Sequence, residues 1–343
     1  FRTTDFGKTW TPLAGGLPQD GCVRFIGEYP GKPGVVFLGT EHALYSSTDS
    51  GMHWDRLGAN LPTTLYMDVD VQGKTHDIVV ATHGRSLYIL DQGSTLAEWS
   101  PAVAAEAAHV YSIRPANIWQ YWEDYSYRGQ DFFTGENPPD GAIIDYTLGK
   151  EASGAQITIT NAAGRVVRTL DGSGSPGVVH RVIWNLRHEP PPPSGAFGQA
   201  AGGEGGGSAT TALPVLPRPA AAEGPWVSPG IYTVTLKAGD ARATRAVDVR
   251  GDPGKPAITL AQYKEREAFL LEVLDVQRKA SEVARQPNPA PGLRRVIQRV
   301  NTLAADFNGS GSRPGTLYGP TAAQKRTLEE LRQALGLAEG NKR

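Results

Sequence analysis

A short signature occurs twice near the start of this chain, and it constrains the fold more than any other feature. Residues 3–10 and 47–54 both read Ser/Thr-x-Asp-x-Gly-x-x-Trp, and their aspartates lie 44 residues apart. A repeat of about this period, with short strands, is typical of a β-propeller blade. In each copy the Asp carboxylate can cap backbone N–H groups of a tight turn, Gly can adopt a positive φ, and Trp can pack the turn against the neighbouring blade. We therefore expect a structural role for the matched residues Asp5, Gly7, Trp10, Asp49, Gly51 and Trp54.

Strand-like segments surround the second signature. Residues 35–47 and 77–91 each contain two runs of β-branched and aromatic residues separated by small turn residues, as expected of strands. About two blades fit into the first hundred residues, whereas a closed propeller needs at least about four. The chain also starts within a repeat, at Phe1. We therefore expect it to be the C-terminal part of a longer protein, or to receive its remaining blades from elsewhere.

The signature resembles the Asp-box, or bacterial neuraminidase repeat, of sialidases, sortilin-type receptors and xyloglucanase-like glycosidases. Residues 81–91 are similar to the propeller end of large, exported, sortilin-like bacterial proteins, with Ser86 in place of the usual second Gly. Segments 135–142 and 317–324 continue this resemblance. In that family an Ig-like domain and a helical tail follow the propeller. The resemblance thus implies an exported protein, located in the periplasm, at the cell surface or outside the cell.

The middle of the chain reads as a β-sandwich. Alternating apolar positions and closely spaced turns continue from residue 141 to 252, including a hairpin turn at 161–164. This series resembles the Ig-like domain of flagellar hook-capping proteins. Segment 188–225, rich in Pro and Gly, is expected to be a disordered insert because it has too little apolar surface to offset its chain entropy.

From residue 256 onward the apolar period becomes helical. Thr259 and Gln262 match a capping box at the start of one helix, and Thr321 and Gln324 match another. Three amphipathic helices are expected, either as a small bundle or packed on the sandwich. The predicted class is a mainly β multidomain protein whose parts are a partial β-propeller (1–108), an aromatic linker (109–140), an Ig-like β-sandwich (141–252) and an α-helical hairpin or bundle (256–343).

Composition excludes several functions. A net charge of −1 gives no overall field that would recruit nucleic acid or an anionic membrane. No apolar run is long enough to span a membrane directly. The histidines are scattered, Cys22 is the single cysteine, and no phosphate-binding Gly loop or nucleophile elbow occurs. We therefore expect no metal and no cofactor.

Candidate sites are few. Asp5 and Asp49 are not expected to be catalytic, because their turns would lie at the outer rim of the blades and not near the central channel. His83 and Arg85 are candidate contacts for an anionic ligand, although a structural role in the turn is the favoured interpretation. The aromatic residues Trp119, Tyr121 and Trp122 could bind a glycan or a protein ligand, or could hold two domains together, which is the favoured alternative.

Three functions remain open at this point. The favoured hypothesis is a non-catalytic binding or scaffold portion of an exported Asp-box propeller protein, whose partners are the remaining blades and a glycan or protein ligand. The second is the C-terminal part of a glycoside hydrolase whose catalytic residues lie in blades outside this segment. The third is a structural subunit of a larger membrane-associated assembly.

Overall fold

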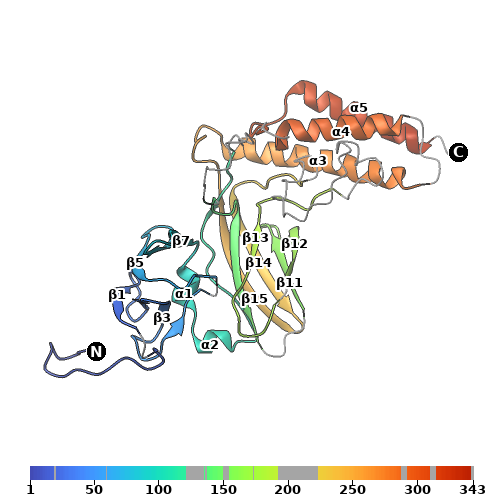
Figure 1. Ribbon diagram of the computed structural model, residues 1–343. Helices are drawn as coiled ribbons and strands as arrows, with labels where there is room; N and C mark the ends of the chain where they lie inside the picture. Colours follow the sequence, from blue (N-terminus) through green and yellow to red (C-terminus); the bar gives the residue numbers. More distant parts are fainter. Residues whose placement is uncertain are drawn as a thin grey trace, which may run out of the picture.

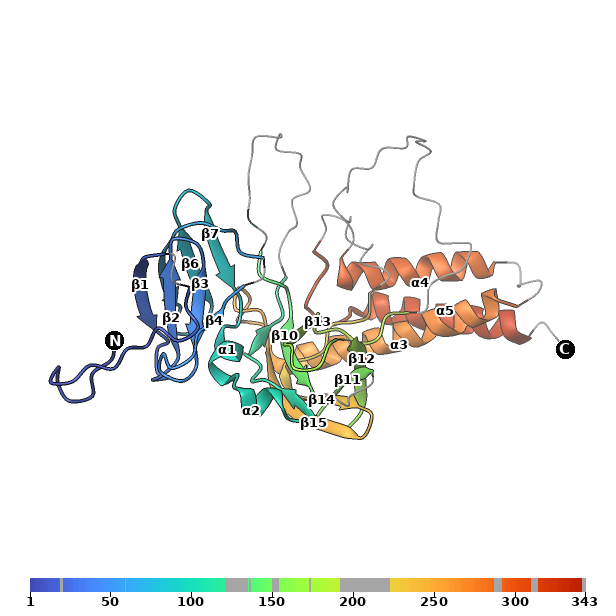
Figure 2. The same cartoon turned by 60° about the horizontal axis from the view of Figure 1, so that its bottom comes forward.

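The protein is mainly β, with helices at its C-terminal end (Figure 1). The structure is a computed structural model that describes residues 1–18, 21–58, 60–120, 135, 137–149, 154–172, 174–191, 223–286, 292–309 and 314–340. Its three parts lie in a row, with two N-terminal sheets, a two-sheet sandwich and the helices following one another (Figure 2). The predicted coarse class, mainly β with C-terminal helices, is confirmed. Most of the expected insert 188–225 lies outside the described residues, as do residues 121–134 and 136 of the expected aromatic linker.

Two antiparallel sheets form the N-terminal part. The strand orders are β1-β2-β3-β4 and β5-β6-β7. The bounds are Val23–Glu28 (β1), Val36–Thr40 (β2), Leu44–Ser47 (β3), Asp55–Arg56 (β4), Tyr66–Val71 (β5), Ile78–Thr82 (β6) and Leu87–Leu90 (β7). Strand β1 packs against β5. The side chains between the sheets form one apolar core, made of Tyr29, Val35, Phe37, Leu44, Tyr66, Val71, Ile78, Val80 and Ala97.

A short helical segment leads from these sheets into the sandwich. Helix α1 (Ser94–Glu98) is followed by α2 (Pro101–Ala104). The Ser100 hydroxyl accepts a hydrogen bond from the N–H of Val103, and Pro101 occupies the first helical position, so both residues favour the start of α2. The chain then adds β8 (Ala108–Val110) to one sheet of the sandwich and β9 (Ala116–Asn117) to the other.

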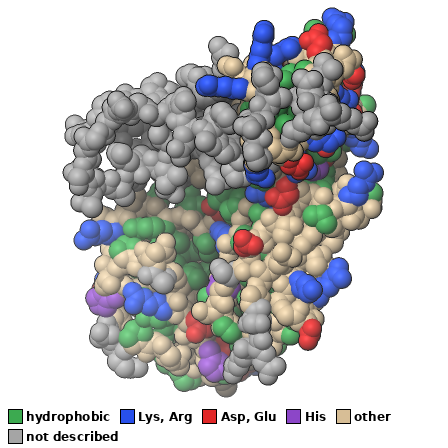
Figure 3. Space-filling view, turned by 90° about the vertical axis from the view of Figure 1, so that its right-hand side faces the viewer, with side chains coloured by type: hydrophobic (Ala, Val, Ile, Leu, Met, Phe, Trp, Pro, Cys, Tyr) green, Lys and Arg blue, Asp and Glu red, His purple; other side chains and the backbone are tan. Residues whose placement is uncertain are grey.

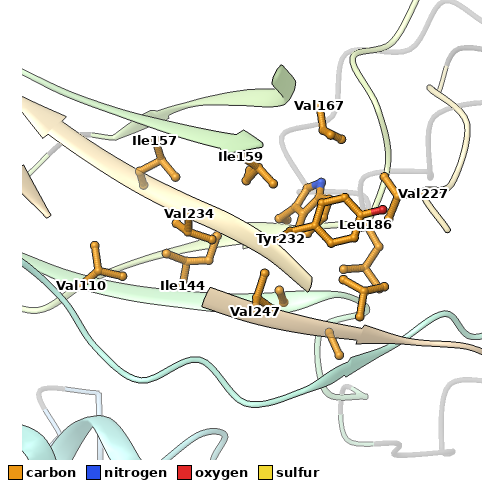
Figure 4. Close-up of a cluster of buried hydrophobic side chains, with 14 of the residues drawn as sticks. Val110, Ile144, Ile157, Ile159, Val167, Leu186, Val227, Tyr232, Val234 and Val247 are labelled. Carbon is orange, nitrogen blue, oxygen red and sulfur yellow. The ribbon is translucent and has the colours of Figure 1, made fainter. Parts of the chain in front are cut away.

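The sandwich consists of a three-stranded sheet, β13-β10-β8, and a five-stranded sheet, β12-β11-β14-β15-β9. The remaining bounds are Ala142–Leu148 (β10), Ala155–Thr160 (β11), Val166–Gly172 (β12), His180–Trp184 (β13), Gly230–Ala238 (β14) and Ala241–Arg250 (β15). Apolar side chains from both sheets meet in one core, in which β10, β11 and β14 contribute Ile144, Ile157, Ile159 and Val234 (Figure 4).

The sequence pattern of β14 explains how it contributes to this core. Tyr232, Val234 and Leu236 are buried, whereas the residues between them are more exposed, as expected when alternate side chains point to opposite faces. Tyr232 meets the fully buried Trp184 edge to face, with ring centroids 5.3 Å apart. The expected hairpin turn at 161–164 joins β11 and β12, and the Asn161 side chain accepts hydrogen bonds from two backbone N–H groups of the turn.

Three helices complete the chain: α3 (Leu260–Ala284), α4 (Leu293–Asn308) and α5 (Ala322–Gly340). Both predicted capping boxes are confirmed. The Thr259 hydroxyl accepts from Gln262 N–H while the Gln262 side chain accepts from Thr259 N–H, and Thr321 and Gln324 repeat this arrangement. The helices share an apolar core formed by residues that include Phe269, Val273, Val300, Leu303, Phe307, Leu328 and Leu331.

Acidic and basic side chains are mixed on the helical surface (Figure 3). Ion pairs link neighbouring helices, including Lys325 with Glu265, Arg332 with Glu272 and Arg299 with Glu330. Within the described part of the chain, no helix combines the length and the apolar character needed to cross a membrane.

The sandwich and the helices meet around one tryptophan. The guanidinium carbon of Arg187 lies 4.1 Å from the centroid of the Trp226 ring, and that of Arg266 lies 5.3 Å from it. Arg266, on α3, also donates to the backbone carbonyls of Thr316 and Phe307. Next to it, Glu267 accepts a hydrogen bond from Ser228 N–H, and its carboxylate lies 2.7 Å from the His188 ring.

The alternation along β14 predicts unequal effects of two substitutions on this strand. Leu236→Ala should lower the free energy of unfolding by about 2–5 kcal/mol, because Leu236 is fully buried in the core. Ile231→Ala on the same strand should change it by no more than about 0.5 kcal/mol, because Ile231 is 56% exposed. Urea unfolding monitored by circular dichroism measures both, and equal losses would contradict the assigned register.

Candidate functional site

The first signature turn is closed by its own polar side chains. The Thr3 hydroxyl accepts from Gly7 N–H at 2.7 Å and donates to the Asp5 carboxylate at 2.9 Å. Asp5 also accepts from the N–H and the hydroxyl of Thr9, at 2.9 and 2.7 Å. These hydrogen bonds, the Thr9 N–H first, lower the pKa of Asp5. Trp10 remains 58% exposed.

The second signature turn repeats this pattern. The Ser47 hydroxyl accepts from Gly51 N–H at 2.8 Å and donates to Asp49 at 2.8 Å, and Asp49 accepts from His53 N–H at 2.9 Å. In both turns the residue after Asp and the following Gly have positive φ, for example 63° at Ser50 and 84° at Gly51. A side chain at position 51 would also press on the ring of Trp54, so Gly is required there.

The groups around Asp49 lower its pKa. Partial burial raises its pKa, but the hydrogen bonds from the His53 ring, His53 N–H and the Ser47 hydroxyl outweigh this effect and lower the pKa to about 2. Trp54 is buried, and its indole N–H donates to Leu13 O at 2.8 Å, which ties the turn to the segment after the first signature. Both signature carboxylates therefore cap backbone amides of their own turns.

The remaining predicted contact residues lie apart from one another. His83 and Arg85 are exposed in the turn between β6 and β7, where Gly84 has a φ of 76° and His83 N–H donates to Leu65 O at 2.9 Å. Trp119 is 45% exposed beyond β9. Tyr121 and Trp122 lie outside the described residues.

A different region forms a cavity, which we call the junction crevice. It has a volume of about 570 Å³ and lies between the first N-terminal sheet, helix α1 and the three-stranded sheet of the sandwich. Its lining comes from four chain segments: Ser46, Thr48, Asp55, Arg56, Leu57 and Gly58; Leu90, Gln92, Thr95, Leu96 and Trp99; Asp145; and Val179 and Arg181. None of the six signature residues belongs to this lining.

Asp145 is the central group of the crevice wall. Its side chain lies on β10 and is fully buried, and Arg181 on the neighbouring strand β13 binds both of its oxygens, at 2.7 and 2.9 Å. Thr95 of α1 donates to Asp145 at 2.6 Å, and Arg181 also donates to Asp91 O at 3.0 Å. Burial opposes the charge of Arg181, but its contacts with Asp145 outweigh burial and raise its pKa. This network joins the N-terminal part to the sandwich.

Gln92, next to this network, is a buried polar residue with a left-handed backbone conformation. Its side chain is 1% exposed, its backbone φ is 58°, and its N–H donates to Asp77 at 2.9 Å. The side-chain carbonyl accepts from Arg114 N–H at 3.4 Å, and Arg114 also pairs with Asp77 at 2.7 Å. The side-chain nitrogen Nε2 has no hydrogen-bond partner among the described residues.

A second polar network reinforces the same junction. Glu98, at the end of α1, pairs with Arg245 of β15, lies 3.1 Å from the His109 ring and accepts from Ser112 N–H at 2.8 Å. Burial raises the pKa of Glu98, but these hydrogen bonds, led by Ser112, outweigh it and lower the pKa.

The crevice suits binding more than acid–base chemistry. Arg181 and Thr95 occupy both oxygens of Asp145, so Asp55 is the one carboxylate in the lining that is left to act on a ligand. A glycosidase needs two carboxylates that flank one bond. Among the described residues, no cluster of three or more His, Cys, Asp or Glu side chains could hold a metal ion.

Sequence reasoning did not single out the crevice residues. One signal was available: Asp145 is the one charged residue of β10, and a charged residue in a strand that is buried on both faces requires a partner. Neither a protein-family model nor a curated protein sequence matches the chain.

The hydrogen bonds of Asp49 predict a dependence of stability on pH. The folded-state pKa of Asp49, about 2, lies below the unfolded value of about 3.9. Asp49 therefore stabilises the fold at pH values above about 3.9 and loses this contribution as the pH falls toward 2. Asp49→Asn should cost about 1 kcal/mol at pH 7, a small value because the group is partly exposed, and should flatten the loss on acidification. Unfolding measured from pH 7 to 2 tests this. Asp306→Asn, at an exposed site on α4, is the control, and an equal change there would contradict the assignment.

The Asp145 network predicts a larger effect. Asp145→Asn should lower the free energy of unfolding by about 3 kcal/mol and speed hydrogen exchange in α1 and β13, because the Arg181 charge loses its partner. The matched control is Asp248→Asn, which breaks the exposed pair with Arg250 and should cost no more than about 0.5 kcal/mol. Unchanged exchange in α1 after Asp145→Asn would show that this carboxylate does not hold the junction.

Proposed function

We propose that this chain is the non-catalytic binding and scaffold portion of an exported bacterial Asp-box β-propeller protein. The observation that carries the proposal is the pair of signature turns, which share one hydrogen-bond pattern at a spacing of 44 residues. In this proposal β1–β4 and β5–β7 are consecutive blades, and the Asp-box carboxylates hold turns and do not react with substrate.

The arrangement of the two N-terminal sheets supports this assignment. Both are antiparallel with strands in chain order, and they pack face to face, as neighbouring blades do. The second sheet has three described strands against four in the first. Leu87 and Ile89, alternate residues on one face of β7, are 63% and 64% exposed, which fits a further blade packing against this face. The proposed partners are therefore the remaining blades, from the same or another chain.

The sandwich and helices fit the scaffold part of the proposal. We assign the sandwich as an Ig-like domain, in agreement with two sheets packed around a fully buried tryptophan, Trp184. Polar networks tie it to the proposed blades through Asp145 and to the helices through Glu267, which contacts His188 and Ser228. Such networks favour one fixed arrangement of the three parts over a flexible string of domains.

A turnover assay tests the non-catalytic assignment. The purified chain, incubated with xyloglucan and with sialyllactose, should release no more reducing sugar or free sialic acid than a heat-denatured sample. This is expected because Asp145 is held by Arg181 and Thr95, leaving Asp55 without a second carboxylate in the crevice. Turnover that is lost in a folded Asp55→Asn variant, but kept in Asp5→Asn as a control, would overturn the proposal.

A further inference from the structure

Strand β7 has one side that is not paired with a described strand. The second N-terminal sheet has the order β5-β6-β7, so β7 lies at its edge. In the first sheet, the corresponding third strand, β3, pairs with a fourth strand, β4, which is antiparallel to it. The second sheet thus has room for one more strand beside β7.

The hydrogen bonds of β7 with β6 show which of its backbone groups are free. In an antiparallel ladder, only alternate residue pairs exchange N–H and C=O hydrogen bonds. Thr82 N–H donates to Ser86 O, and the bonded pairs then continue every second residue, as Val80–Tyr88 and Ile78–Leu90. The N–H and C=O groups of Leu87 and Ile89 therefore point away from β6. Both residues are also exposed, so a partner can reach this edge.

The other described edge strands carry features that oppose pairing, and β7 does not. Charged side chains, bulges, short length or a covering segment protect sheet edges from added strands. Strands β1 and β5 each contain a bulge and two charged residues, β13 contains Arg181, and the edge of β12 is covered by hydrogen bonds with Glu189. Strands β4, β8 and β9 have only two or three residues. By contrast, β7 reads Leu-Tyr-Ile-Leu, with a regular register and no charge or proline.

The two ends of β7 differ in chemistry. Before the strand, Arg85 is exposed and forms no ion pair with a described residue. After it, Leu90 belongs to the lining of the junction crevice, whose apolar walls include Leu57 and Leu96. A strand antiparallel to β7 has its C-terminal end beside Arg85 and its N-terminal end beside the crevice. Charge complementarity therefore favours an acidic residue at the C-terminal end, and the crevice favours an apolar residue at the N-terminal end.

From the free edge and its two ends we infer that β7 binds an extended polypeptide segment of a partner protein, which adds to the second sheet as an antiparallel fourth strand. Backbone groups of the segment pair with those of Leu87 and Ile89, which gives most of the affinity in this mode of recognition. An acidic residue of the segment pairs with Arg85, and an apolar side chain enters the crevice. This inference names the class of ligand for the proposed binding function and rests on that function.

Amide hydrogen exchange of the full chain, measured by NMR, tests this inference. The probe is the synthetic peptide acetyl-Leu-Thr-Val-Thr-Val-Asp, which has an apolar residue at its N-terminal end and an acidic one at its C-terminal end. Without peptide, the amides of Leu87 and Ile89 should exchange fast, whereas those of Tyr88 and Leu90 should be protected by their bonds to β6. With peptide, the exchange of Leu87 and Ile89 should slow about tenfold or more, because their N–H groups gain acceptors.

Two variants at one position separate backbone pairing from side-chain contact. Ile89→Pro removes the outward N–H and leaves the ladder with β6 intact, as proline does at sheet edges, so fluorescence anisotropy of a labelled peptide should show binding about tenfold weaker. Ile89→Ala, the matched control, keeps the N–H and should change binding by less than about threefold. If Ile89→Pro fails to fold, Arg85→Glu in the exposed turn is the further variant and should weaken binding about threefold.

Three results would overturn the inference. They are the absence of peptide binding, protection that appears elsewhere in the chain while Leu87 and Ile89 stay unprotected, and equal weakening by Ile89→Pro and Ile89→Ala. None of these would change the turnover assay, in which failure of the proposed non-catalytic function would appear as sugar release.

Discussion

The arrangement of the whole molecule depends on one buried carboxylate. Asp145 has no exposed surface, so its charge must be satisfied by protein groups, and Arg181 and Thr95 supply them from two different parts of the chain. Because Thr95 belongs to α1 and Arg181 also holds Asp91 O, the end of the second N-terminal sheet is fixed relative to the sandwich. The junction crevice is the space that this fixed arrangement leaves open.

A comparable constraint acts where the sandwich meets the helices. Arg266 is buried, and its pKa falls to about 9, mainly because burial disfavours the charge and secondly because Arg187 is close. The guanidinium groups of Arg187 and Arg266 both lie over the Trp226 ring. Glu267, the next residue of α3, accepts from Ser228 N–H and lies 2.7 Å from the His188 ring. Apolar packing alone would leave α3 free to slide on the sandwich, whereas these directional contacts define one position for it.

Local features could be predicted from the sequence, and the crevice could not. The capping boxes at Thr259 and Thr321, the hairpin at Asn161 and the C-terminal helices follow from interactions within a few residues, which a sequence displays directly. The crevice joins Asp55, Gln92 and Arg181, whose meeting depends on how separate sheets pack. Even the burial of Gln92 is invisible in sequence, since glutamine is usually exposed. Among the crevice residues, Asp145 was the one that the sequence could have indicated, because it is the single charged residue of a mostly apolar strand.

The polar groups of this junction define its geometry. A buried ion pair is rarely more stabilising than an apolar pair of the same volume, so stability alone does not explain Asp145 and Arg181. Their directional hydrogen bonds instead set the distance between α1 and β13, and with it the width of the crevice. These hydrogen bonds therefore hold the N-terminal part and the sandwich in one arrangement.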